Sequence, residues 1–262
     1  MKTMKILFAL TFAVFLLTQP AIIRADEDRK PSEGGPRVSL GAAMIVMPEY
    51  EGSNKHKFTA APIIEYDQGR FFLSAFNGAG LRVINGPSFQ MGPLVKYRPG
   101  RDQDDSDDLK GMGDISGGAE AGLFVNWQIV EQVGLKTEVM HGLGSAKGFT
   151  ADLSLNYNHQ LTEDLNFGLG LGGRYADRKY NEEHFGVSER QSRKSKYEAY
   201  KPGGGIKHVA TQAVFPYGLT DSLQRGVFGE YKRLTGPAAD SPLVTRGSPN
   251  QLSSGLALTW NN

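Results

Sequence analysis

Apolar residues recur at every second position over most of this chain, and this periodicity restricts the fold more than any other feature. The clearest stretch is Leu153-Ser-Leu-Asn-Tyr-Asn-His-Gln-Leu161, where the odd positions are mostly apolar and the even ones carry amides or hydroxyls. Successive side chains of a strand point to opposite faces, so the stretch predicts a strand with one apolar and one polar face. The apolar face belongs to the core of a soluble sheet, whereas in a transmembrane barrel it contacts lipid and the polar face lines the lumen.

The N-terminus favours the membrane alternative. Lys2 and Lys5 precede the apolar run Ile6–Leu17, and Ala25 offers a small residue for cleavage. This layout is typical of a secretory signal peptide, because the run is shorter than the roughly 20 residues that a transmembrane helix needs. We therefore expect a cleaved signal peptide over residues 1–25. No later stretch of the sequence resembles a membrane helix, so insertion has to use strands.

The composition fits one exported domain with many strands. Without the signal peptide, 26 basic residues stand against 28 acidic ones, and this balance argues against a nucleic-acid partner. The chain has no cysteine, which excludes disulfides and thiolate sites. Residues 26–36 are polar and rich in Gly and Pro, so we expect a loose periplasmic leader there and the barrel over residues 37–262.

Twelve strands are predicted, with ten as the alternative because the third and fourth are short. The expected ranges are 37–47, 58–66, 70–76, 79–85, 88–98, 116–128, 132–142, 148–161, 165–176, 205–219, 223–234 and 251–260.

The links between these strands alternate in length. Tight turns at 67–69, 85–87, 130–132, 162–164 and 220–222 alternate with links that include four long loops, 48–57, 99–115, 177–204 and 235–250. Barrels of the bacterial outer membrane have short periplasmic turns and long outer loops, and an even number of strands leaves both termini in the periplasm. The sequence thus predicts an all-β fold, a transmembrane antiparallel β-barrel of the outer membrane. A soluble sandwich would explain the alternation but not the asymmetry of the loops.

Aromatic and charged residues agree with this topology. Aromatic rings prefer the two membrane interfaces. They are expected at the periplasmic strand ends (Tyr66, Phe71, Trp127, Tyr217 and Trp260) and at the outer ends (Tyr97, Tyr175 and Tyr231). The strand positions between the apolar ones are expected to face the lumen, and they carry charges of both signs. These residues are Lys96, Glu120, Lys136, Glu138, Arg174, Glu230 and Lys232. Balanced signs favour a salt-bridged plug over the alternative, a narrow pore.

Five stretches in or beside the long loops are too specific for a generic strand pattern. They are Pro48-Glu-Tyr-Glu-Gly-Ser53, Gly100-Arg101 with Asp108-Leu-Lys-Gly-Met-Gly-Asp-Ile115, His184-Phe-Gly-Val-Ser188, Arg233-Leu234, and Ala239-Asp-Ser-Pro-Leu-Val244. In this order, behind a signal peptide, they resemble the MipA/OmpV family of outer-membrane proteins (MipA stands for MltA-interacting protein) over essentially the whole mature chain. The last residue of family members is usually aromatic, whereas this chain ends Trp260-Asn261-Asn262.

The resemblance implies a scaffold without enzymatic activity. Such a scaffold brings a murein lytic transglycosylase together with a bifunctional penicillin-binding protein for peptidoglycan growth. Other members resemble adhesins or stress-linked envelope proteins, so the resemblance does not fix the partner. A narrow diffusion pore and an adhesin-type protein are the alternatives.

A partner that works on peptidoglycan can reach only the periplasmic rim of such a barrel. The polar groups expected there lie in three tight turns and are Glu131, Gln132, Glu163, Asp164, Asp221 and Ser222. The competing interpretation is that tight turns favour acidic and amide residues for conformational reasons alone.

No catalytic, cofactor-binding or metal site is predicted. His184 and Ser188 are close in sequence, but no Gly-x-Ser-x-Gly elbow contains a candidate serine. The acidic run 102–108 departs from the EF-hand pattern, because Asp107 stands at its glycine position and Gly113 at its terminal glutamate position. We expect a solvated outer loop there that bridges divalent cations to lipopolysaccharide. For the basic residues of 190–196 a mobile loop is the expectation, and contact with the phosphates of outer-membrane lipids is the alternative.

Overall fold

The structure, a computed structural model, describes residues 35–262. The signal peptide expected at 1–25 and most of the leader lie outside the described residues. The strands are β1 (Arg37–Pro48), β2 (His56–Gln68), β3 (Phe71–Ser74), β4 (Gly78–Leu81), β5 (Ile84–Asn85), β6 (Phe89–Arg98), β7 (Gly118–Val130), β8 (Val133–Gly142), β9 (Phe149–Gln160), β10 (Asn166–Ala176), β11 (Gly205–Gly218), β12 (Leu223–Leu234) and β13 (Asn250–Asn261).

These strands form one antiparallel sheet that closes on itself. β1 pairs with β13 along most of its length, and β4 completes the ring by pairing with β6 at Ala79↔Val95 and Gly80↔Leu94. The two-residue strand β5 pairs only with the first residues of β6 and is not part of the closed ring. The remaining strands make a closed 12-stranded barrel, which confirms the predicted fold and strand count.

The strand expected at 79–85 is broken into β4 and β5 around Arg82. The guanidinium of Arg82 turns back to the end of β2, where it pairs with Asp67, and it donates to the carbonyl of Gly69 in the β2–β3 turn at 2.6 Å. This side-chain anchor holds the chain beside the β2–β3 turn and interrupts the ladder. The sequence pattern of residues 79–85 contains no sign of it.

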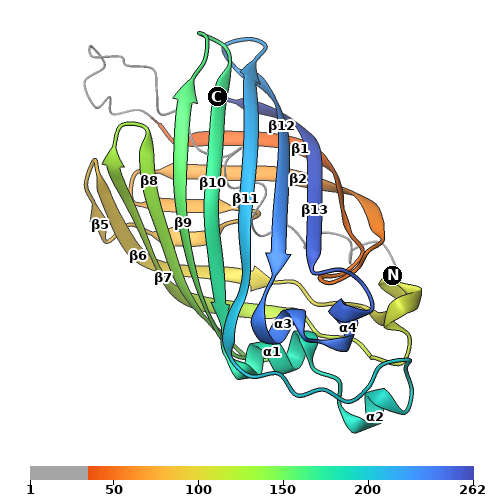
Figure 1. Cartoon of the computed structure of the whole chain (residues 1–262). Coiled ribbons are helices and arrows are strands. Elements are labelled where there is room, and N and C mark those ends of the chain that lie inside the picture. Colours follow the sequence, from red (N-terminus) through yellow and green to blue (C-terminus); the bar gives the residue numbers. More distant parts are fainter. Residues whose placement is uncertain (1–34) are drawn as a thin grey trace.

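Short turns and long loops lie at opposite ends of the barrel (Figure 1). The long-loop end carries the helices α1 (Arg178–Phe185), α2 (Glu189–Ser192), α3 (Gly236–Ala239) and α4 (Pro242–Thr245), together with the 3-10 turns η1 (Gln103–Asp105) and η2 (Asp107–Leu109). Between residues 35 and 262 no helix is long and apolar enough to cross a membrane.

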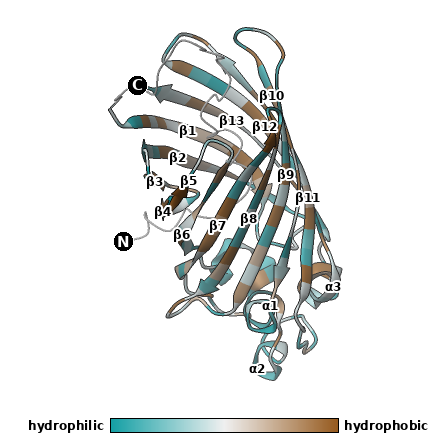
Figure 2. Cartoon of the chain, turned by 90° about the vertical axis from the view of Figure 1, so that its left-hand side faces the viewer, coloured by the Kyte–Doolittle hydropathy of each residue, from teal (hydrophilic) through white to brown (hydrophobic). Residues whose placement is uncertain are grey.

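The two faces of the wall differ as the alternation predicts. On β9, Leu153 and Leu155 are 53% and 43% exposed, whereas Ser154 and Asn156 are both 6% exposed. Figure 2 shows the resulting alternation of hydrophobic and hydrophilic residues along the strands. The expected aromatic residues Trp127, Trp260, Tyr97, Tyr175 and Tyr231 are all exposed on the outward face. An outer surface of this kind fits a lipid environment.

Candidate functional site

The short-turn end is the first candidate, because all six predicted contact residues lie on its rim. Glu131 and Gln132 are in the β7–β8 turn, and the next two turns carry the other four. The turns are neighbours, since Gly218 N–H donates to the carbonyl of Asp164 at 2.9 Å and Asn158 N–H donates to that of Gln132 at 2.8 Å. The acidic members Glu131, Glu163, Asp164 and Asp221 are exposed. The structure therefore brings the predicted residues to one edge.

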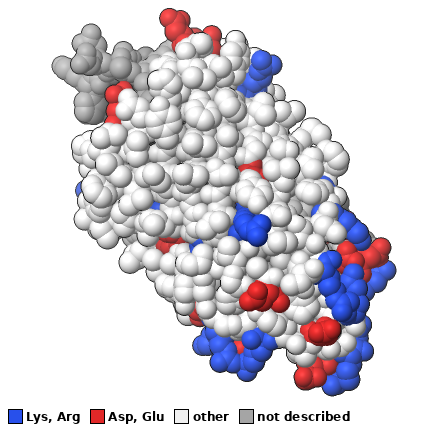
Figure 3. All heavy atoms as spheres, viewed as in Figure 1, with Lys and Arg blue, Asp and Glu red and all other residues white. Residues whose placement is uncertain are grey.

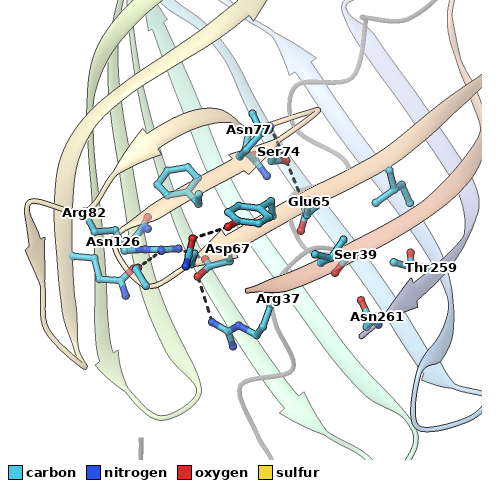
Figure 4. A pocket seen from close by; sticks show the side chains of 18 of the residues that line it. Arg37, Ser39, Glu65, Asp67, Ser74, Asn77, Arg82, Asn126, Thr259 and Asn261 are labelled. Atoms are coloured by element: carbon cyan, nitrogen blue, oxygen red, sulfur yellow. Dashed lines mark hydrogen bonds and ion pairs between the residues drawn. The ribbon is translucent and has the colours of Figure 1, made fainter. Parts of the chain in front are cut away.

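Inside this rim lies a vestibule of about 1100 Å³. Of the six predicted residues, only Asp221 and Ser222 line it. Much of the rest of its wall is hydroxyl and amide, including Ser39, Thr259 and Asn261 near its mouth (Figure 4). Sequence reasoning missed the vestibule, because its lining comes from many strands that are distant in sequence.

An ion-pair network holds one wall of the vestibule. Asp67 on β2 pairs with Arg82 and also with Arg37 at 3.6 Å (Figure 4). The Arg82 guanidinium lies 4.9 Å from the centre of the Phe72 ring, and Phe72 meets Phe124 edge-on at 5.3 Å between ring centres. The network joins β2, the β3–β4 hairpin and β7, so it fixes the shortest strands of the barrel.

Charged groups form the inner end of the vestibule. They lie on the polar faces of the strands, which were expected to face the lumen. Glu138 pairs with Lys96 and, at 2.8 Å, with Lys136. Further along the lumen Arg98 pairs with Glu120, Arg174 with Asp152 at 2.6 Å, and Lys232 with Glu230 at 3.4 Å. All seven predicted lumen charges thus face inward and are paired, as the plug interpretation expects.

An apolar cluster fills the other side of the lumen, and the expected alternation did not indicate it. The cluster comes from β1, β2, β11, β12 and β13, with Phe76 of the β3–β4 turn pointing inward. Its buried members are Ala43, Ile45, Met47, Ala61, Ile63, Phe76, Val214, Phe228 and Ala257. The available signal was the loss of alternation in Ala42-Ala-Met-Ile-Val-Met47, where both parities are apolar.

The long loops pack into a cap over the other end of the barrel. The five specific sequence stretches converge in it: one buried cluster joins Tyr50, Leu109, Met112, Val187, Tyr197 and Leu243, and a second joins Ala176, Tyr180, Phe185, Leu234, Ala238 and Val244. Gly52 has a φ of +108°, and a Cβ there would lie 2.7 Å from a methyl carbon of Val244, so this motif position requires glycine. The loops are therefore packed against one another.

Buried polar groups link the cap to the barrel. The Lys207 ammonium on β11 donates to Glu51 at 2.9 Å and to the Tyr180 hydroxyl at 3.3 Å. Although burial raises the pKa of Glu51, the charges of Lys207 and Lys232 outweigh it and lower that pKa to about 2. Arg101 donates to the His184 carbonyl at 3.0 Å.

His184 is buried in the cap and does not form a catalytic pair with Ser188. Its Nδ1 hydrogen-bonds the carbonyl of Tyr180 at 3.0 Å, and its ring stacks on that of Tyr180. The Ser188 hydroxyl donates instead to Gln191 and caps α2. Burial, reinforced by the charge of Lys207, lowers the pKa of His184 to about 3, so its ring is neutral.

The acidic run 102–108 is an ion-pair partner for the surrounding cations. Asp108 pairs with Lys55 at 2.9 Å and with Lys196 at 2.5 Å, and Asp105 pairs with Lys57 at 3.7 Å. Asp104, Asp105 and Asp107 are exposed, as expected of a solvated loop, whereas Asp108 is held between its two lysines. Among residues 35–262, no three His, Asp or Glu side chains are grouped to hold a metal ion. Charged residues gather at the cap and are sparse over the strands (Figure 3).

A closed barrel with an apolar outer band, short turns at one end and long loops at the other defines an outer-membrane β-barrel protein. The profile described as MltA-interacting protein MipA matches residues 40–262, so the chain belongs to this family.

Relatives agree with the family assignment. The chain is 24% identical over 226 residues to the putative outer membrane protein YiaT of Escherichia coli strain K12, covering 84% of this chain and 89% of that one. It is 27% identical over 112 residues to a 24 kDa outer membrane protein of Pasteurella multocida, an alignment that spans only 42% of either chain.

Solved structures with a similar fold include the KdgM porin (10% identity, TM-score 0.45, 85% of this chain and 98% of that one). Another is the outer membrane channel DcaP of Acinetobacter baumannii (9% identity, TM-score 0.41, 87% and 96%). The fold assignment itself rests on the strand pairing described above. In such proteins the short turns face the periplasm and the long loops face outward.

Proposed function

We propose that this protein is a non-enzymatic scaffold whose working surface is the periplasmic rim. On this proposal the rim brings a membrane-bound lytic transglycosylase together with a bifunctional penicillin-binding protein. The family name supports the first of these partners. The observation that carries the proposal is the asymmetry of the molecule: the vestibule opens inside the rim, whereas packed loops cover the opposite end.

The three neighbouring turns supply the charge for such a contact. Glu131, Glu163 and Asp221 are exposed and lie on consecutive turns of one rim. Exposed charges of this kind mainly steer association and set its salt dependence. A partner with a basic surface would therefore bind faster at low ionic strength.

Binding of a purified lytic transglycosylase to the reconstituted barrel tests the proposal. The triple variant Glu131→Lys, Glu163→Lys and Asp221→Lys should bind roughly tenfold more weakly at low salt, with the difference shrinking as salt is raised. The matched control is Glu198→Lys, a charge reversal in the cap, which should leave binding unchanged. An interaction that is lost in the cap variant and kept in the rim variant would contradict the scaffold and point to an adhesin.

A narrow diffusion pore is the second candidate, and one observation favours it. Several buried polar atoms in the lumen have no hydrogen-bond partner among the described residues, including Oδ1 of Asn156, both amide atoms of Gln212 and Nδ1 of His208. Such atoms usually bind water, and a hydrated track along β9–β11 is what a narrow pore would need. Conductance of the purified protein in planar bilayers separates the two candidates.

A further inference from the structure

Neutral polar side chains are the largest group in the lining of the vestibule. Eleven of the lining residues are Asn or Gln and six are Ser or Thr, against three Lys or Arg and four Asp or Glu. The charged members offset one another, because Asp67 pairs with Arg37 and Arg82, and Glu138 pairs with Lys136. The vestibule is therefore suited to an uncharged polar ligand rather than to an ion.

Four of these amides lie on neighbouring strands and form what we call the amide wall: Gln90 of β6, Asn126 and Gln128 of β7, and Asn156 of β9. Gln90 pairs directly with Asn126, and Gly134 of β8 lies between Gln128 and Asn156 in the strand register. Gly134 leaves the surface between these two amides open, because the nearest atom to a Cβ there would be Oε1 of Gln128 at 3.3 Å. The amide wall thus presents both donors and acceptors to the vestibule.

Two carbonyl oxygens of the amide wall have no hydrogen-bond donor. Oδ1 of Asn126 and Oδ1 of Asn156 are buried and accept nothing from residues 35–262, although Nδ2 of Asn156 donates to the Ser154 hydroxyl at 3.3 Å. Buried polar atoms in proteins are normally paired. The terminal torsion of an Asn side chain is broad, so both oxygens can turn toward a donor that enters the vestibule. The amide wall therefore calls for a ligand that donates hydrogen bonds.

Hydroxyl and amide groups also face the amide wall from across the vestibule. Ser39 of β1 and Thr259 and Asn261 of β13 lie on the side opposite Asn126 (Figure 4). A ligand between the two sides meets polar groups in both directions. A sugar carries hydroxyls around its whole perimeter, and each hydroxyl both donates and accepts. An extended peptide matches this lining less well, because its side chains point away from its backbone groups to the other two faces.

We propose that the vestibule is a binding site for a neutral oligosaccharide that enters from the rim. Sugar hydroxyls donate to Oδ1 of Asn126 and of Asn156, and further hydroxyls bond to Ser39 and Thr259 on the opposite side. The cavity of about 1100 Å³ is slightly larger than the roughly 300–1,000 Å³ typical of ligand sites, so it holds a short oligosaccharide together with bridging water. The site does not depend on the proposed scaffold, because it uses the lining of the vestibule and not the exposed charges of the rim turns.

Titration calorimetry on the unsubstituted protein, in a detergent without sugar head groups, tests the site. The probes are two uncharged tetrasaccharides, the tetramer of N-acetylglucosamine and maltotetraose. Saturable binding of either one supports the proposal, and the tighter binder shows whether acetamido groups are recognised. The proposal is overturned if neither binds at millimolar concentration. It is also overturned if an uncharged tetraalanine peptide with blocked ends binds more tightly than both.

Removal of the two unpaired acceptors locates the binding. Asn126→Leu with Asn156→Leu should bind the preferred tetrasaccharide roughly tenfold more weakly, because two hydrogen bonds to the ligand are lost. Asn166→Leu is the matched control, since Asn166 lies on β10 and does not line the vestibule. The rim variant Glu131→Lys with Glu163→Lys should also bind the sugar normally, whether or not it binds a protein partner. Equal weakening in either control would place the sugar elsewhere and refute the site.

A photoreactive tetrasaccharide, which carries a diazirine at its reducing end, gives a readout that does not depend on how the variants fold. It is photolysed with the unsubstituted protein, and the adducts are mapped by mass spectrometry. Adducts are expected within 126–134 and 154–158 at the amide wall and near Ser39 on the opposite side. Adducts confined to the cap or to outward-facing residues would contradict a sugar site in the vestibule.

Discussion

A single buried imidazole, that of His184, is expected to make the folded cap less stable in acid. His184 has a pKa of about 3 in the folded cap, because burial and the nearby Lys207 disfavour its charged form, whereas an exposed histidine has a pKa of about 6.5. Between these values the opened cap binds a proton that the folded cap does not. Cap stability from this residue is therefore complete above pH 6.5 and is lost as the pH falls toward 3, by about 2 kcal/mol at pH 5.

Hydrogen exchange of the Gly186 and Val187 amides, corrected for intrinsic rates, measures this effect. Both amides are bonded within the cap. Their protection should fall between pH 7 and pH 5 in the unsubstituted protein and much less in His184→Gln. Glu51 has a pKa of about 2 and titrates below this interval in both states. An equal loss of protection in the two proteins would rule out His184 as the cause.

Glu138 is expected to stabilise the barrel, because its carboxylate neutralises two lysines in the lumen. Its carboxylate pairs with Lys96 and Lys136. Glu138→Ala leaves both cations buried, and removing one partner of a buried pair costs roughly 3–5 kcal/mol. We expect the temperature at which the folded form disappears on a heat-modifiability gel to fall clearly. The exposed Arg178–Glu182 pair is the control, since Glu182→Ala should change little; similar shifts in both variants would contradict the plug.

At the scale of elements, the strands could be predicted from the sequence, but the break within one of them could not. Alternation predicted β9 within one residue at each end, because a wall between lipid and lumen imposes a period of two. The break between β4 and β5 escaped prediction, since it depends on Arg82 reaching Asp67 across the hairpin. Local patterns report which face a residue takes, but they do not report which side chain from another strand it meets.

In the cap, too, local motifs could be recognised from the sequence, but the contacts between them could not. The motifs around Tyr50, Phe185 and Leu243 were recognisable as specific, yet their convergence was not predictable, because contacts between loops so distant in sequence leave no periodic signal. The predicted rim residues are on one edge for a simpler reason, since consecutive hairpins of a barrel place their turns side by side. The vestibule lies inside this rim. It is lined by the inward-facing polar side chains of many strands and by residues of the short β3–β4 hairpin.

The cap is an element with its own core, and this leads to a further prediction. Phe185 is fully buried among cap residues, so Phe185→Ala should destabilise the cap by roughly 3–5 kcal/mol. The cluster reaches the barrel only at the ends of two strands, at Ala176 of β10 and Leu234 of β12, so we expect the rest of the strand pairing to persist without it. Proteolysis within residues 177–204 should accelerate while heat-modifiability stays unchanged. Loss of the folded barrel in this variant would show that cap and barrel fold as one unit.

At the scale of the whole molecule, the topology predicts that the cap lies outside the cell and the rim in the periplasm. Cysteines at Asp104 and Lys194, both exposed in the cap, should react with an impermeant reagent on intact cells. A cysteine at Glu163 on the rim should react only after the outer membrane is permeabilised. The reverse pattern would invert the orientation.

A scaffold of the proposed kind has a closed outer end and works from its periplasmic side. Conductance of the purified protein in planar bilayers tests this most directly. The packed cap clusters and the paired lumen charges predict an electrically silent barrel at moderate voltage. Steady single-channel currents that scale with salt concentration would contradict the account and establish the protein as a pore.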